Sequence, residues 1–564
     1  MEQGDGVGEV LIRLENSLNT NASDHERSFL RTYGFEQPVT FGLLIQMPMA
    51  RFLALVSGIL VLAPYILAQT PSILWQHALG GSELEFILQM SKTADGGSVH
   101  VGLSYSNDGD CVGNHDPDLS DVWVVKLDDA GTIEWQRMLG GTSEDWGYSI
   151  AQTSDGGYIV GGFAGSEDGD VSGSHGWQDG WIVKLFADGS TDWQKALGGS
   201  GFDGGVLVAQ TSDGGYVVTM PSNSSDGDVL VNLGSFDVWV ARLDATGVIL
   251  WQHSYGGSGD DQPSSISLTS DDGVVIAGRS DSQDGDVTGN HGGADAWVLR
   301  LAPNGDVVWQ RSLGGSDHEQ GSSAHVCMDG GYIVAAATLS TDGDVTDSNG
   351  QNDAWVVKLD ATGALLWQTT LGGSDNDGLG GVLETPDQGF IAVGGTASSD
   401  GDVTSQHGVI DGWVVGLDAA GGIQWQQTFG GSGDDGFASV ALLDDGDLVI
   451  AGTAEINDGD VTGVHGSIDG WVVRVHVSPL SIGGLEQEAF SVAPDPTSGM
   501  IIIALPPSWS SGVVSVVDAL GQVVRTERMS GLRHVLDLSA LPKGMYLISV
   551  ASPEGRSGRR VVLE

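Results

Sequence analysis

The chain has 564 residues, of which 75 are acidic and 22 basic, giving a formal net charge of −53. Residues 71–480 alone hold 60 acidic and 11 basic residues, and 52 of these acids are aspartate. A surface this negative repels phosphates, which excludes nucleic acid as a partner. Aspartate in such excess over glutamate is typical of turns and of loops that offer oxygen ligands.

The first predicted element is a signal peptide that begins well inside the chain. Met49 and Arg51 precede an apolar stretch over residues 52–67, and Ala68 suits cleavage before Gln69. The apolar stretch is short for a membrane span, so residues 49–68 are predicted to be a signal peptide. We expect residues 1–48 to be disordered and to come from a misplaced start. The protein is then secreted.

A long repeat follows over residues 71–477. One tryptophan series recurs every 58 residues from Trp123 to Trp471, and a second runs from Trp75 to Trp425 with spacings of 60 once and 58 thereafter. Each copy holds four short β-rich runs joined by turns, many of them Asp-Gly turns, as in antiparallel hairpins. Seven copies predict an all-β fold, a seven-bladed β-propeller of four-stranded blades. The recurring tryptophans are expected to be core residues.

The two ends of the repeat predict how the ring closes. The chain enters on a fourth strand, around Trp75, and leaves on a third strand, around Trp471. If the strand around Trp75 completes the last blade by pairing with the strand around Trp471, neither of these two strands is left as a free sheet edge.

Two acidic loops recur in the copies. The loop between strands two and three carries Asp-Gly-Asp, and the loop that joins one blade to the next carries an acid three residues after a Ser or Thr. The joining-loop acids are Glu85, Asp145, Asp203, Asp261, Glu319, Asp377 and Asp435. With the first strand of each blade innermost, both loops lie on one face. We expect this acidic rim to be the interaction face.

The Asp-Gly-Asp loop matches part of the EF-hand calcium pattern, with oxygen ligands at positions 1, 3, 5 and 12 and glycine at position 6. Three copies combine these features, which makes calcium a candidate cofactor. Their candidate ligands are Asp168, Asp170, Ser172 and Asp179; Asp284, Asp286, Thr288 and Asp295; and Asp458, Asp460, Thr462 and Asp469. Repeat three has Leu230 and Val231 at positions 5 and 6 and is not expected to bind. Alternatively, the aspartates only stabilise the turns by bonding backbone amides.

Two tryptophans in the propeller lie outside the repeat positions: Trp146 in a joining loop and Trp177 in an Asp-Gly-Asp loop. Indoles beside carboxylates suit a sugar platform, so both are candidate ligand-binding residues for a glycan or a surface protein. The alternative is loop packing. No catalytic motif is recognisable, and a binding or structural module is favoured over an enzyme. The alternative function is a carbohydrate-active enzyme, a glycoside hydrolase or lyase, that uses the same rim.

The repeat itself resembles known propeller repeats. The segment "LDATGALLWQ" from Leu359 is similar to the repeat of quinoprotein-type propellers, and the whole repeat resembles repeats of uncharacterised surface proteins of Bacteroidota. The first resemblance implies the propeller fold only, and the second brings no known activity.

The C-terminal tail carries a separate set of motifs behind a predicted linker over residues 478–489. They are Pro494, Pro496 and Gly499; Asp518 and Gly521; Leu538 and Leu541; Gly544 and Tyr546; and Arg559, Arg560, Val561 and Val562. With these motifs, residues 490–564 resemble the type A C-terminal sorting domain of type IX secretion cargo, although Asp495 replaces the family's usual asparagine. The resemblance implies the type IX secretion machinery as a partner and export across the outer membrane. It also implies removal of the tail, and often attachment to surface lipopolysaccharide. The alternating pattern predicts a small C-terminal β-sandwich.

Overall fold

The structure is a computed structural model that describes residues 71–116, 118–346, 348–477, 491–493, 497, 499–505, 511–517, 523–531, 533–539, 541–552 and 555–563. Within these ranges the chain forms strands and no helix, so the described part contains no helix able to span a membrane. The predicted disordered start (1–48), signal peptide (49–68) and linker (478–489) lie outside the described residues. Two compact units divide the chain near Ser481.

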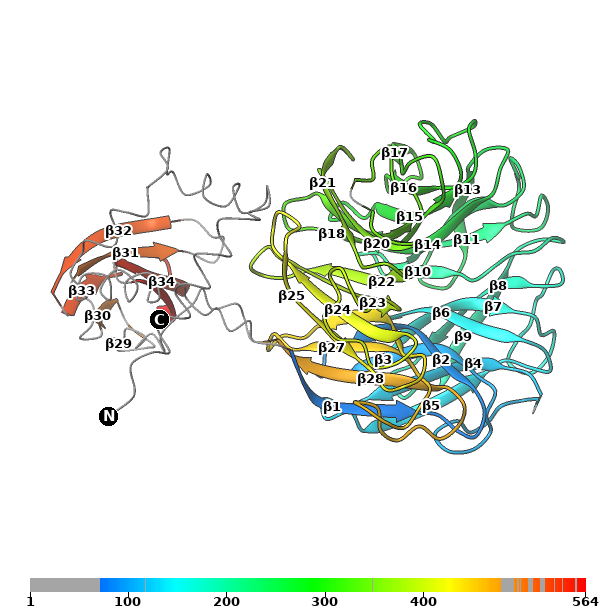
Figure 1. Cartoon of the computed structure of the whole chain (residues 1–564), viewed down its shortest axis with the longest axis horizontal. Coiled ribbons are helices and arrows are strands. Elements are labelled where there is room, and N and C mark those ends of the chain that lie inside the picture. Colours follow the sequence, from blue (N-terminus) through cyan, green and yellow to red (C-terminus); the bar gives the residue numbers. More distant parts are fainter. Residues whose placement is uncertain are drawn as a thin grey trace, which may run out of the picture. The chain divides into compact units, whose positions relative to one another are not determined.

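The first unit is a seven-bladed propeller, as the repeat predicts (Figure 1). Each blade is a four-stranded antiparallel sheet whose strands follow one another from the innermost to the outermost. Blades one to three are β2 (Glu85–Lys92), β3 (Ser98–Ser104), β4 (Asp121–Leu127) and β5 (Ile133–Leu139); β6 (Asp145–Gln152), β7 (Tyr158–Ala164), β8 (Asp179–Leu185) and β9 (Thr191–Leu197); and β10 (Leu207–Gln210), β11 (Tyr216–Ser222), β12 (Asp237–Leu243) and β13 (Ile249–Tyr255).

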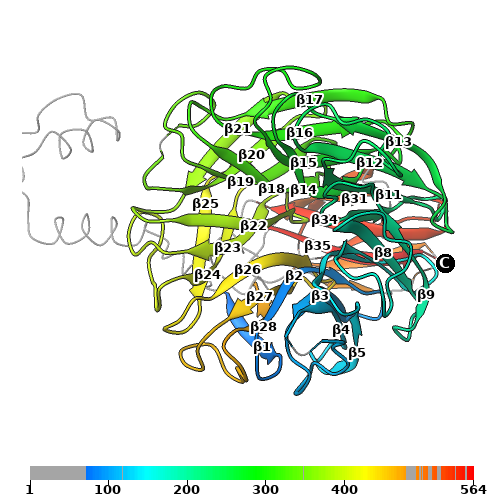
Figure 2. The same cartoon turned by 90° about the vertical axis from the view of Figure 1, so that its right-hand side faces the viewer.

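The other four blades follow the same order. They are β14 (Asp261–Leu268), β15 (Val274–Ser280), β16 (Asp295–Leu301) and β17 (Val307–Leu313); β18 (Glu319–Val326), β19 (Tyr332–Thr338), β20 (Asp353–Leu359) and β21 (Leu365–Leu371); β22 (Asp377–Glu384), β23 (Phe390–Thr396), β24 (Asp411–Leu417) and β25 (Ile423–Phe429); and β26 (Gly436–Leu442), β27 (Leu448–Ala454), β28 (Asp469–His476) and β1 (Ser72–Leu79). The first strand of each blade is innermost (Figure 2). Together these strands line a central cavity of about 700 Å³.

The ring closes as the chain ends predict. Strand β1 pairs antiparallel with β28, with Gln76 opposite Val473. The indole nitrogen of Trp471 donates a hydrogen bond to Gln76 Oε1 at 2.8 Å, the same bond that joins Trp181 to Gln194 within one blade. Closure therefore repeats the packing inside an ordinary blade and leaves no exposed edge there.

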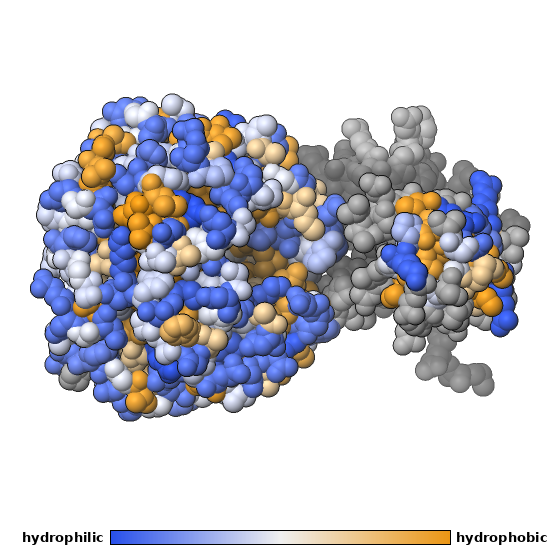
Figure 3. All heavy atoms as spheres, turned by 180° about the vertical axis from the view of Figure 1, so that it is seen from behind, coloured by the Kyte–Doolittle hydropathy of each residue, from blue (hydrophilic) through white to orange (hydrophobic). Residues whose placement is uncertain are grey.

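The two tryptophan series have different structural roles. Trp123, Trp239 and their equivalents on the third strands are fully buried between blades. The second series lies at the blade periphery, where each indole from Trp75 to Trp367 packs against the turn glycine of the next blade. For example, a Cβ on Gly189 would be 2.7 Å from the Trp135 ring. Both series thus hold neighbouring blades together. Much of one side of the propeller surface is hydrophilic, with apolar patches between (Figure 3).

The second unit is a small β-sandwich. One sheet contains β29 (Ser491–Ala493), β30 (Met500–Ala504) and β33 (Arg533–Asp537), and the other contains β32 (Val523–Ser530), β31 (Ser511–Val517), β34 (Gly544–Ser552) and β35 (Gly555–Leu563). Ile501, Val514, Leu538 and Tyr546 belong to a single core cluster between the sheets. The motif residues Leu538 and Tyr546 are therefore core residues.

Candidate functional site

The middle glycine of the Asp-Gly-Asp loop is required by a close backbone contact. Gly169 has φ of +66°, and a Cβ there would lie 2.3 Å from the carbonyl oxygen of Gly140 in the joining loop. The next residue, Asp170, donates its backbone N–H to that same oxygen at 2.8 Å. The loop is thus pinned to the joining loop, and only glycine fits at the contact.

The four candidate calcium ligands of repeat two each bond a different group of the protein. Asp168 Oδ1 accepts the backbone N–H of Thr142 at 2.8 Å, and Asp170 Oδ2 accepts that of Gly140 at 3.3 Å. The Ser172 hydroxyl accepts a hydrogen bond from the Gln194 side chain. Asp179 Oδ2 accepts the backbone N–H of His175. Only the Asp179 bond lies within the loop itself, whereas Asp168 and Asp170 tie the loop to the joining loop.

The other two candidate loops are built in the same way. Asp284 and Asp458 accept the backbone N–H groups of Ser258 and Ser432, each at 2.7 Å. Thr288 and Thr462 accept hydrogen bonds from the side chains of Gln310 and Gln76. Asp295 and Asp469 accept backbone N–H groups from the histidines four residues before them, and Asp286 and Asp460 bond the joining-loop glycines. Among the described residues, no group of three or more His, Cys, Asp or Glu side chains is arranged to hold a metal ion. Calcium binding in these loops stays a prediction.

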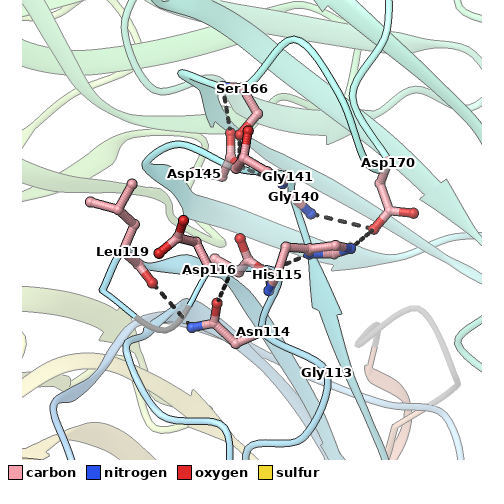
Figure 4. Close-up of polar contacts among 12 residues, drawn as sticks. Gly113, Asn114, His115, Asp116, Leu119, Gly140, Gly141, Asp145, Ser166 and Asp170 are labelled. Carbon is pink, nitrogen blue, oxygen red and sulfur yellow. Dashed lines mark hydrogen bonds and ion pairs between the residues drawn. The ribbon is translucent and has the colours of Figure 1, made fainter.

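The aspartates at the start of the third strands have a partner that the sequence pattern does not indicate. Asp121, at the start of β4, and Asp145, at the start of β6, belong to different blades and are both fully buried. A Cβ on Gly140 would lie 2.4 Å from Asp121 Oδ1 and 2.6 Å from Asp145 Oδ2, so the two carboxylates face each other across that glycine. Figure 4 shows this interface, where Asp145 binds Ser166 and Gly141 while His115 lies beside Asp170.

Burial dominates the electrostatics of this carboxylate pair. Loss of hydration raises the pKa of Asp145 to about 6, partly offset by hydrogen bonds from Ser166 and Gly141, while the charge of Asp121 raises it further. The pKa of Asp121 is raised for the same first reason. His115 Nδ1 lies 2.6 Å from Asp121 Oδ2, and its own pKa is raised by that contact despite its partial burial. These acids are enclosed, so they offer no carboxylate pair to a substrate.

The two off-repeat tryptophans differ in environment. Trp146 is half-buried and donates its indole N–H to Ser120 Oγ at 2.9 Å and to Glu144 Oε2 at 3.0 Å. Its ring lies 5.4 Å from that of Phe163 and 6.3 Å from that of Tyr148, which lines the central cavity. Trp177 is 80% exposed. Trp146 thus belongs to an aromatic cluster and Trp177 is a surface side chain.

A second aromatic pair lies at blade three. The rings of Phe202 and Phe236, both half-buried, meet edge to face at 5.6 Å. A Cβ on Gly205, in the joining segment of blade three, would lie 2.4 Å from the Tyr148 ring. We call Trp146, Tyr148, Phe163, Phe202 and Phe236 the aromatic crescent. Equivalent positions to Trp146 in blades four to seven carry Gln262, Gln320, Gly378 and Gly436, so the crescent breaks the sevenfold symmetry.

Comparison with known proteins supports the sorting role of the tail. Residues 491–564 match the family described as secretion system C-terminal sorting domain. The tail therefore marks an exported protein of the type IX secretion system, which is secreted or held at the cell surface.

The chain has more distant similarities to known proteins. The regulatory protein FlaEY of Caulobacter vibrioides is 27% identical over 310 residues, covering 48% of this chain, and the chain spans 31% of that relative's length. Among solved structures, PorZ, a surface component of the type IX secretion system of Porphyromonas gingivalis, is 11% identical with a TM-score of 0.37 over 87% of this chain and 61% of PorZ. Sqt1 from Chaetomium thermophilum is 11% identical with a TM-score of 0.37 over 88% of this chain and 100% of Sqt1.

Proposed function

We propose that this exported protein is a binding module and that its ligand is a neutral glycan held at the loop face over blades two and three. The observation that carries the proposal is the aromatic crescent beside the central cavity. Aromatic faces pack against the apolar faces of sugar rings, and nearby polar side chains accept hydroxyl hydrogens. Glu144 is a polar side chain of this kind, and its carboxylate accepts the indole N–H of Trp146. The strongly negative propeller repels sulfated and uronic acid sugars.

A glycan array probed with the full chain tests the proposal. We expect binding to neutral glycans and not to anionic ones. Trp146→Ala should weaken that binding roughly fivefold, because one stacked aromatic contributes on the order of 1 kcal/mol. Gln320→Ala, at the equivalent position in blade five, is the matched control and should bind like the parent.

The result also separates the proposal from the alternative function. Binding without turnover supports a binding module, whereas release of shortened sugars would assign a carbohydrate-active enzyme. If no neutral glycan binds, or Trp146→Ala binds as tightly as the parent, the crescent is only a packing cluster. Melting curves of both variants must show that the propeller stays folded.

A further inference from the structure

A basic side chain lies largely enclosed near the end of the third strand in six of the seven blades. Each of these cations forms an ion pair, at 2.5–3.1 Å, with the aspartate of the turn between the first and second strands of its blade. The pairs are Lys126–Asp95, Lys184–Asp155, Arg242–Asp213, Arg300–Asp271, Lys358–Asp329 and Arg474–Asp445. The alkyl stem of each cation is therefore enclosed in the blade, and its charge meets a carboxylate at the surface.

Blade six keeps the aspartate of this pair and lacks the cation. Gly416 occupies the position of the basic residue on β24, and residues 377–429 contain no lysine or arginine at all. The turn aspartate, Asp387, accepts the Thr385 hydroxyl at 2.6 Å, as Asp155 accepts that of Thr153 in blade two. The carboxylate is thus held as in the other blades, but its own blade supplies no positive charge to it.

The outer tryptophan of blade six also lacks its usual partner. In the other blades this indole packs against the glycine of the turn between strands three and four of the next blade, as Trp367 does on Gly421. In blade seven those strands, β28 and β1, come from opposite ends of the repeat, so no turn joins them. Trp425 lies instead over Gly416, where a Cβ would be 2.3 Å from the indole ring. It is buried, whereas the other six members of its series are half-buried.

These two departures from the repeat coincide at a pocket between blades six and seven. The pocket has a volume of about 370 Å³, which is within the size range of small-molecule sites, and most of its wall is apolar. Phe390, Trp425 and Leu448 contribute to the apolar wall, and Asp387 contributes a carboxylate. The pocket therefore combines an apolar enclosure with the one turn aspartate that has no cation from its own blade.

From this combination we propose that the pocket binds an aliphatic cation, an alkyl chain that ends in an ammonium or guanidinium group. The charged group pairs with Asp387, and the alkyl chain packs against Trp425. The ligand thus supplies from outside what lysine or arginine supplies within the other blades. A hydrogen bond between two charged groups is about twice as strong as one between neutral groups, and an indole face also attracts cations.

The remaining charges of the pocket favour the same class of ligand. Among the described residues that line it, Asp387, Asp418 and Asp445 are acidic and none is lysine or arginine. His476 also lines the pocket, and its Nδ1 lies 2.7 Å from Asp447 Oδ1. An anionic ligand would therefore be repelled. The site is independent of the proposed glycan site, because the aromatic crescent belongs to blades two and three.

NMR titration of the full chain with n-butylamine, which is a lysine side chain without its backbone, tests the assignment. Ionic strength is held fixed, because a net charge of −53 attracts any cation diffusely. We expect saturable binding at one site per chain, competition by n-propylguanidine, and no competition by the uncharged n-butanol. Asp387→Asn should weaken the binding roughly tenfold, because a hydrogen bond between charged groups is lost.

Asp444→Asn is the matched control for the loss of one negative charge. Asp444 lies in the corresponding turn of blade seven, pairs with Lys92 and does not line the pocket, so this variant should bind like the parent. Gly416→Lys restores the internal cation and should abolish binding. If contact with Trp425 prevents that variant from folding, Asp387→Asn decides alone.

A short peptide with one lysine identifies the source of the cation. Tighter binding of the peptide than of n-butylamine would assign the site to a side chain of another protein, and weaker binding would assign it to a free amine. Three outcomes would overturn the proposal: n-butanol binds as tightly as n-butylamine, Asp387→Asn binds like the parent, or Asp444→Asn loses as much affinity as Asp387→Asn. Melting curves check that each variant is folded.

Discussion

Single glycines and aspartates determine the loop face. The Asp-Gly-Asp motif recurs because its glycine contacts the joining loop in a left-handed conformation, while its aspartates accept backbone N–H groups. Gly173, four residues further along, also has positive φ, at +86°, but a Cβ there would meet nothing within 4 Å. Substitutions at these two glycines therefore separate the free-energy cost of the left-handed conformation from the additional cost of a steric clash.

Replacing Gly169 should therefore destabilise the propeller more than replacing Gly173. A left-handed conformation costs a residue with a Cβ roughly 1–2 kcal/mol. The contact with the Gly140 carbonyl adds about 1–3 kcal/mol to Gly169→Ala alone. Urea unfolding of both alanine variants measures the difference. Equal losses would show that the backbone contact has no energetic role.

The buried acids predict an unusual pH dependence. The folded pKa of Asp145, about 6, lies above its value of about 3.9 in an unfolded chain. The folded state therefore takes up a proton at this group first, and the contribution of Asp145 to stability rises as pH falls from 7.5 toward 5. His100, whose pKa burial lowers to about 3, contributes in the opposite direction over the same range. Asp121, Asp170 and His115 face Asp145. The pKa of Asp237 is raised in the same direction, to about 6, first by burial.

Melting temperatures from pH 7.5 to 5.0, recorded with a chelator present, measure this effect. Exposed acids with a lowered pKa, such as Asp213 at about 2 beside Arg242, lose their contribution only below this window. As the pH falls through this window, the melting temperature of the parent should gain relative to that of Asp145→Asn. Parallel pH profiles of the parent and the variant would contradict the prediction.

At the level of the elements, the 58-residue period made the blades predictable, because each copy shows the same hydrophobic runs, turns and tryptophans. The pairing of acids across blades was not predictable in this way. Asp179 and Asp203 are 24 residues apart and belong to different blades, and the EF-hand spacing suggested partners for Asp179 within its own loop. Only the relative placement of two blades brings these two side chains together. The sequence feature that could have indicated this pairing is the glycine at the start of every joining loop.

Deletion of residues 71–82 should open the ring at blade seven. Strand β28 would then lose β1 and expose an unpaired edge next to the Trp471 indole. We expect oligomers or aggregates by size-exclusion chromatography, because an open edge pairs with other chains. Gln76→Ala, which keeps the strand and removes one side-chain bond, should stay monomeric. A monomeric deletion variant would show that β1 is dispensable.

At the level of the whole molecule, the propeller and the tail each have their own hydrophobic core. A chain that ends at Val477 should therefore keep a propeller with nearly the parent's melting temperature. It should also fail to leave the cell envelope, because the sorting domain is gone. Fractionation of cells that express the truncated chain tests this. Normal amounts of truncated protein outside the cell would contradict the sorting role.

Closure by β1 also determines when the propeller can finish folding. The bond between Trp471 and Gln76 joins residues 395 positions apart, so the first strand synthesised has no partner until almost the whole repeat exists. Loop-closure entropy grows only slowly with chain length, about 0.6 kcal/mol per doubling, so the finished ring is little weakened by this separation. The separation affects the timing of folding instead. The six preceding blades can form as the chain grows, while β1 stays unpaired until β28 has been made. Completion of the ring is therefore expected to be the slowest folding step, and any chain interrupted before β28 stays an open ring.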